Sequence, residues 1–258
     1  MAGSTVSLDD YLRCDAQALD AHQKAFADEY EFAKLIFLLG QEVWGHVGFS
    51  DSDEDRAVAA LVGTSLRYYA AATGLFMRGH HTEAFGTIRT ALEAGAYAVQ
   101  IRLKPQLAKT WIGEDDWKKR KAAFGSDTSM FRQPLLAHLE EHYGLYSEHG
   151  THARFYMAAR GMDAPKGSGN AALYFGDDPN NTGRFIFGHA SIGMRDLIEK
   201  TYIPLFWGEL NKAPAHIRDL VKRSHELHRS MEPKWRQQMD EWKGRIDSGD
   251  PGERGGKA

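Results

Sequence analysis

The sequence predicts an all-α protein, an antiparallel helical bundle with one small Gly-rich β-hairpin or loop insert. Three observations support this fold class: apolar residues recur at helical spacing in several long segments, short connections join those segments, and glycine concentrates in one stretch. With 258 residues, the chain has the length of one large domain. We therefore expect a single helical domain over residues 1–246, with the insert at residues 153–184, and a disordered tail at residues 247–258.

The N-terminal half contains the clearest helical periodicity. Helices are expected over residues 7–22 and 28–47, and the acidic residues at 51–54 precede a longer helix over residues 56–79. Gly79 ends that helix, and Thr82 is the expected N-cap of the next one, over residues 83–103. The helices over residues 56–79 and 83–103 carry nearly continuous apolar stripes, so they are the most strongly indicated elements of the bundle.

The C-terminal half is less regular. Short helices are expected over residues 106–112 and 114–124, and another from residue 128 or 134 to 147. Residues 160–183 hold five Gly and two Pro, which flank the two short alternating runs 154–159 and 171–175, a pattern typical of a hairpin or loop. Helix resumes over residues 185–210, with a kink expected at Pro204. A last helix begins at Pro214, and Pro233 should bend or break it.

Composition and charge exclude several classes of protein. The 32 Lys and Arg against 35 Asp and Glu give a net charge of −3, which argues against a protein that coats nucleic acid. Cys14 is the single cysteine, so no intrachain disulfide can form. The start of the sequence lacks the pattern of a secretory signal, and no apolar run is long enough to span a membrane. We expect a cytoplasmic protein with no membrane contact and no cofactor.

Histidines supply one set of candidate site residues. The segment His138-Leu-Glu-Glu141-His142 has the spelling of inverted zinc peptidases, although a solvated helix face is the expected explanation. His149 and His152 add an H-x-x-H spacing where a helix ends, and one of them could instead bond the last helical carbonyls. A metal-dependent hydrolase using His138, His142, His149 or His152 is therefore one alternative, with no metal as the prediction.

Charged residues within the Ala-rich helices supply a second set. Arg67, Arg89 and Glu93 stand out in otherwise apolar runs, and Arg89 and Glu93 are spaced i,i+4 so that they can form an ion pair at the rim of the core. Together with His152 they define a predicted polar pocket. Its candidate ligand-binding residues are Arg67, Arg89, Glu93, Tyr146 and Ser147.

Several short motifs suggest a family. Arg89-Thr-Ala-Leu-Glu93, followed by Tyr143-Gly-Leu-Tyr146-Ser147 and Gly150-Thr-His152, resembles the motifs of a group of uncharacterised bacterial all-helical proteins and, more distantly, of the HEPN superfamily. The resemblance spans residues 56–152. It implies a helical bundle, often dimeric, and in some HEPN members a metal-independent ribonuclease with an R-x4–6-H motif. On that basis His152 or His149 would be the acid or base, and Arg89 or Arg154 would steady phosphate charge.

The ribonuclease motif itself is not distinctive in this chain. Four Arg/His pairs have the required spacing, against roughly 2.5 expected by chance, and none of them includes His152. The sequence therefore predicts first a helical domain that binds a small molecule or a protein partner near Arg89, Glu93 and His152. The alternatives are a HEPN-type ribonuclease or nucleotide-binding enzyme, with RNA as ligand, and the metal-dependent hydrolase.

A second copy of the chain is the expected partner. The helix over residues 185–210 is expected to carry exposed apolar residues that would suit the seam of a homodimer. These are Phe187, Ile192, Phe206 and Trp207.

Overall fold

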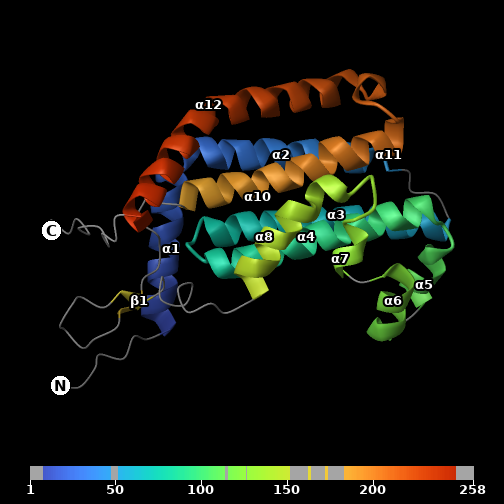
Figure 1. Cartoon of the computed structure of the whole chain (residues 1–258), viewed down its shortest axis with the longest axis horizontal. Helices are drawn as coiled ribbons and strands as arrows, with labels where there is room; N and C mark the ends of the chain where they lie inside the picture. The colour runs from blue at the N-terminus through green and yellow to red at the C-terminus, as the bar shows by residue number, and fades with distance from the viewer. Residues whose placement is uncertain are drawn as a thin grey trace.

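The computed structural model describes residues 8–47, 52–113, 116–125, 127–151, 162–163, 172–173 and 183–247. In these ranges the chain is helical except for turns and two strands of two residues each (Figure 1). The prediction of an all-α bundle is confirmed. None of the helices in these ranges is long and apolar enough to cross a membrane.

Seven helices make up the first half of the chain. They are α1 (Leu8–Ala25), α2 (Ala27–Gly45), α3 (Asp53–Phe76), α4 (His81–Leu103), α5 (Leu107–Gly113), α6 (Trp117–Phe124) and α7 (Asp127–Met130). The predicted helices over 28–47, 56–79 and 83–103 correspond to α2, α3 and α4, with ends that differ by a few residues. Ser52 sets the start of α3, because its hydroxyl accepts the Asp55 backbone N–H at 3.1 Å.

A tight turn at Gly79 joins α3 to α4. Gly79 has a φ of 81°, in the left-handed region that glycine tolerates, and the His80 N–H returns to the Leu75 carbonyl at 2.9 Å. The chain enters α4 directly after this turn, with the Ala84 N–H bonded to the His80 carbonyl. The prediction of Thr82 as N-cap was therefore wrong, because the turn at Gly79 begins the helix before Thr82 is reached.

The second half of the chain is more segmented. Its elements are η1 (Ala137–Leu139), α8 (Glu140–Thr151), β1 (Met162–Asp163), β2 (Ala172–Leu173), α10 (Gly183–Leu197), η2 (Ile198–Tyr202), α11 (Ile203–Trp207), η3 (Leu210–Lys212) and α12 (Ala215–Asp247). β1 and β2 pair antiparallel, with Met162 opposite Leu173. The rest of the predicted insert, including the run 154–159, and the predicted tail after residue 247 lie outside the described residues.

Two prolines affect this half differently. Pro204 lies in the first turn of α11, where its missing N–H is tolerated, and a π-helical turn, η2, precedes it. The single helix predicted over residues 185–210 is therefore divided into α10, η2 and α11. Pro233 lies inside α12, which stays helical across it and bends before its C-terminal end in Figure 1.

The long helices pack around a shared core. α3 runs along α4, α4 also packs against α8, and α2 contacts α3, α10 and α12 (Figure 1). α10 contacts α2, α3, α4 and α12, so it lies inside the bundle rather than on its surface. Its apolar residues complete the core, together with large buried side chains such as Phe32, Tyr69 and Phe76.

The structure places the residues of the predicted dimer seam against the core of the same chain. Phe187 of α10 is only 1% exposed, whereas Ile192, Phe206 and Trp207 pack against the core and keep part of their surface exposed. Because α10 is an inner helix, the buried Phe187 cannot form part of a seam between two copies.

Candidate functional site

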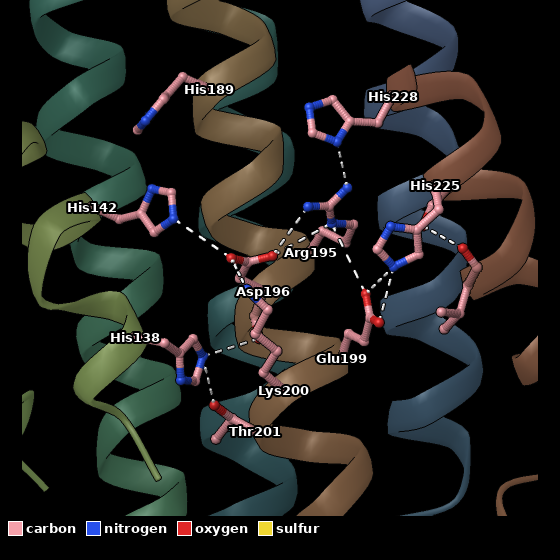
Figure 2. Close-up of polar contacts among 12 residues, drawn as sticks. His138, His142, His189, Arg195, Asp196, Glu199, Lys200, Thr201, His225 and His228 are labelled. Atoms are coloured by element: carbon pink, nitrogen blue, oxygen red, sulfur yellow. Dashed lines mark hydrogen bonds and ion pairs between the residues drawn. The ribbon is translucent and has the colours of Figure 1, made fainter. Parts of the chain in front are cut away.

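A buried group of charged and histidine side chains surrounds the C-terminal half of α10. Arg195 and Asp196 are each 5% exposed, which is rare for charged residues. Figure 2 shows His138 of η1 and His142 of α8 on the Asp196 side of α10, and His225 and His228 of α12 on the Arg195 side. We call this group the α10 polar cluster, and it consists of His138, His142, His189, Arg195, Asp196, Glu199, Lys200, Thr201, His225 and His228.

Asp196 is the anion on which several contacts of the cluster converge. Its carboxylate accepts from Lys200 Nζ at 2.7 Å and from Arg195 Nη2 at 3.3 Å. His142 Nε2 lies 3.7 Å from Asp196 Oδ2, an ion-pair distance. Burial alone would raise the pKa of Asp196, but its contacts with His142, Lys200 and Arg195 outweigh this and hold the pKa well below its usual range. Asp196 is therefore ionised.

His138 holds the η1 turn against α10. Its Nε2 lies 3.2 Å from the Asp196 backbone carbonyl and 3.3 Å from Thr201 Oγ1. The Thr201 hydroxyl of η2 donates to the Leu135 carbonyl at 3.1 Å, so the segment just before η1 is held there as well. Burial lowers the pKa of His138, which favours the neutral ring. These contacts assign His138 to positioning α8.

His142 and His189 form the part of the cluster nearest to α8. Their ring centroids are 4.8 Å apart, and Figure 2 shows the two rings in the space between α8 and α10. The Tyr146 hydroxyl donates to the His189 carbonyl at 2.9 Å and lies 3.4 Å from His189 Nδ1. Gly193 permits this approach, because a Cβ there would lie 2.5 Å from the Tyr146 hydroxyl oxygen.

Burial sets the protonation of this part of the site. It lowers the pKa of His189 to about 4, with the neighbouring His142 acting in the same direction, so His189 is neutral at pH 7. Burial also raises the pKa of Tyr146 well above its ordinary value, and the charge of Asp196 adds to the effect. The Tyr146 hydroxyl therefore keeps its proton and serves as a donor.

One nitrogen in this part of the site has no partner. His142 Nδ1 is buried and makes no hydrogen bond, whereas Nε2 faces the Asp196 carboxylate. A neutral imidazole with its proton on Nε2 presents a lone pair at Nδ1, as an acceptor or a base. The His142 side chain keeps 12% of its surface exposed, so the ring lies at the edge of the core. A carboxylate that fixes the imidazole while its other nitrogen is available is an arrangement suited to acid–base chemistry.

On the α12 side of the cluster, the polar side chains already contact one another. Arg195 Nη1 donates to His228 Nδ1 at 2.9 Å, and His225 Nε2 pairs with Glu199 Oε2 at 2.8 Å. Burial, followed by the charge of Arg195, lowers the pKa of His228. A neutral His228 can accept from Arg195, whereas a protonated one could not. This side therefore fixes α12 to α10.

The structure separates the residues of the predicted pocket. Arg89 and Glu93 form the predicted ion pair at 2.9 Å, and Arg89 Nε also donates to the Tyr143 hydroxyl of α8 at 3.1 Å. Tyr143 in turn donates to Glu93 at 2.7 Å. Arg67 is exposed and lines a different recess, between α2 and α3.

The remaining predicted residues belong to α8 or follow it. Tyr146 is buried beside His189, and Ser147 follows it with partial burial. The side chain of His149 and the whole of His152 lie outside the described residues. Among the described residues, no three His, Cys, Asp or Glu side chains come together in a way that could hold a metal ion.

The expectation of a solvated face at His138 and His142 was wrong. Both side chains turn toward α10, because η1 and the start of α8 lie against it. Sequence reasoning also missed His189, Arg195 and Asp196. An adjacent Arg-Asp pair in an otherwise apolar helix was the one available signal, since such a helix is a candidate for burial.

Comparison with protein-family models, curated proteins and solved structures finds no significant match to this chain. The geometry of the α10 polar cluster is therefore the basis on which a function can be inferred.

Proposed function

We propose that this chain binds a small polar molecule between α8 and α10, with His142 as the group that contacts it. The observation that carries the proposal is the buried Nδ1 of His142, which has no hydrogen-bond partner. Leaving a buried polar atom without a partner costs about 1–3 kcal/mol, and a ligand that donates to it would recover that energy.

The neighbouring groups narrow the chemistry of the ligand. Asp196 orients His142, and the neutral ring of His189 packs against it at 4.8 Å between centroids. A ligand with a hydroxyl, amide or amine N–H could donate to His142 Nδ1. Because Asp196 can stabilise the imidazolium, His142 could also take a proton from that ligand. A compact alcohol, amide or amine is therefore the preferred class.

This proposal keeps the sequence-based idea of a small-molecule site but places it at a different point on α8. The Arg89–Glu93–Tyr143 group is internally neutralised, since the guanidinium is bonded to both the carboxylate and the phenol. Arg89 therefore has less charge to offer an incoming anion than the sequence suggested. Its role in the proposal is to hold α4 against α8.

A ribonuclease is the second candidate, favoured by the imidazole of His142, whose buried Nδ1 has no hydrogen-bond partner. In metal-independent cleavage, one group takes the proton of a 2′-hydroxyl as its oxygen attacks the adjacent phosphorus. As the bond from phosphorus to the departing 5′ oxygen breaks, that oxygen takes up a proton. His142 would be the base in such a reaction, and its imidazolium would then give that proton.

The two candidates can be tested with protein labelled with ¹⁵N at histidine. We expect the His142 ring resonance, assigned through His142→Gln, to shift with at least one member of a panel of small alcohols, amides and amines. His216→Gln is the matched control, because His216 is 52% exposed on α12 and pairs with Glu42. A panel that leaves the His142 resonance unmoved, or that binds His142→Gln equally well, would overturn the proposal.

The same proteins distinguish the ribonuclease. Wild type and His142→Gln are incubated with mixed-sequence RNA in the presence of EDTA, and the products are separated on a gel. Cleavage by wild type alone would favour the second candidate over simple binding. No cleavage by either protein would exclude it.

A further inference from the structure

We propose a second ligand site, on the side of α2 that faces away from α12. This site takes a small apolar molecule that bears one negative charge. The site is a groove between residues 37–44 of α2 and residues 59–67 of α3, with a volume of about 300 Å³. That volume is at the lower end of the range found for small-molecule sites. We call it the α2–α3 groove.

Small residues on α3 open the groove and an aromatic ring forms its wall. Ala60 is exposed in it, and Gly63 lies under the Trp44 indole, where a Cβ would be 3.3 Å from the ring. Trp44 Nε1 donates to the Ala59 carbonyl at 2.8 Å, which fixes the orientation of the indole. The wall is therefore rigid and apolar, and Phe37 extends it. An aromatic or aliphatic body fits such a surface.

Arg67 supplies the positive charge of the α2–α3 groove. It is the one charged residue among those lining the groove, and its Nη2 donates to the neutral Thr64 hydroxyl at 3.1 Å. By contrast, Arg56 and Arg236 on other exposed helix surfaces bond to carboxylates. A contact with a hydroxyl orients the guanidinium without neutralising it. The positive charge at the rim is therefore complementary to a carboxylate or sulfonate on the ligand.

The remaining polar group in the groove is the amide of Gln41. An amide can donate to the same anionic group or accept from a neighbouring hydroxyl. The groove thus combines an apolar wall, one fixed cation and one amide, which is the composition expected for an amphiphilic monoanion rather than a sugar or a cation.

The test uses two fluorescent probes. 8-Anilinonaphthalene-1-sulfonate is an apolar ring system with one negative charge, and Nile red is apolar and neutral. We expect wild type to bind both probes. Arg67→Glu should bind the sulfonate at least about tenfold more weakly and bind Nile red unchanged. Ala60→Phe, which fills an exposed part of the groove, should weaken both.

Lys222→Glu is the matched control, because it makes the same change of charge at a side chain that is 74% exposed on α12. Circular dichroism melts verify that each variant folds. Wild type that binds neither probe, Arg67→Glu that binds the sulfonate as wild type does, or Ala60→Phe that binds both unchanged would each overturn the inference. These outcomes are independent of the His142 site, since no substitution touches α8 or α10.

Discussion

Asp196 is the residue on which the buried charges of the molecule depend. Arg195, Lys200 and His142 all face its carboxylate, and Arg195 is almost completely buried. Removing one partner of a buried ion pair leaves the other charge uncompensated, which is a larger effect than the net contribution of the intact pair. The stability of the α8–α10 contact is therefore tied to this single side chain.

We predict that Asp196→Asn lowers the free energy of unfolding by about 3 kcal/mol, because the amide cannot neutralise Arg195 and Lys200. Urea denaturation of the full chain measures this value. Asp20→Asn is the control: Asp20 is 69% exposed and pairs with Lys24 on the surface, so the change should stay within about 0.5 kcal/mol. Equal effects of the two substitutions would contradict the role assigned to Asp196.

For single residues, contacts between neighbours in the sequence were predictable, whereas contacts between residues far apart in the sequence were not. The Arg89–Glu93 pair follows directly from its i,i+4 spacing on a helix. The contact between His142 and Asp196 joins residues 54 positions apart, and it depends on how α8 packs against α10. No spacing in the sequence contains that information, and the same histidine pattern fits a solvated face equally well.

Among the elements, α10 is held in place by close approaches at glycine. A Cβ at Gly188 would lie 2.3 Å from the Trp235 ring of α12. Trp235 is itself 3% exposed, and its Nε1 donates to the buried Glu29 of α2 at 2.9 Å. The indole therefore joins three helices and has little freedom to move away.

We predict that Gly188→Ala lowers the free energy of unfolding by about 1–3 kcal/mol, because the added methyl group displaces the Trp235 ring. Gly144→Ala is the matched control on α8, where a Cβ meets nothing within 4 Å. There the higher helix propensity of alanine should leave stability unchanged or raise it by up to about 1 kcal/mol. Thermal unfolding of both variants measures the change in stability. A Gly188→Ala variant that is as stable as wild type would contradict the close packing of Gly188 against Trp235.

The long helices were predictable because each has its own signal in the sequence. α3 and α4 carry continuous apolar stripes, and Gly79 marks the turn between them. The division of residues 183–207 into α10, η2 and α11 was not predictable, because the apolar pattern continues through all three. The same reason explains why the buried Phe187 was expected at an exposed seam, since an apolar stripe does not distinguish an inner helix from an exposed one.

For the whole molecule, the lowered pKa values of buried histidines indicate that the free energy of unfolding falls in mild acid. The pKa of His189 is about 4 in the folded chain and has its ordinary value near 6.5 in the unfolded chain. Between these two values the unfolded chain binds more protons, so the free energy of unfolding falls as the pH falls. The pKa values of His138 and His228 are lowered as well, so they act in the same direction.

We predict that His189 alone removes about 2 kcal/mol between pH 7 and pH 5, with the full stability present above pH 6.5. Urea denaturation at a series of pH values measures the slope. His189→Gln should have a shallower slope than wild type, whatever its absolute stability, because glutamine does not titrate. A wild-type profile that is flat from pH 7 to pH 5 would contradict the prediction.

The π-helical turn at η2 has a consequence for insertions and deletions. The Ile203 N–H bonds to the Ile198 carbonyl five residues back, so this turn holds one residue more than an α-helical turn. The extra residue is accommodated within the turn, so Ile203 stands one helical turn after Ile198, as the residue four positions on would in an α-helix. Removing one residue here would restore the α-helical bond pattern and leave Ile203 and the later side chains facing the same way, whereas a deletion inside α10 would rotate every later side chain by about 100°. This segment therefore accepts a change of one residue in length more readily than the α-helices on either side of it.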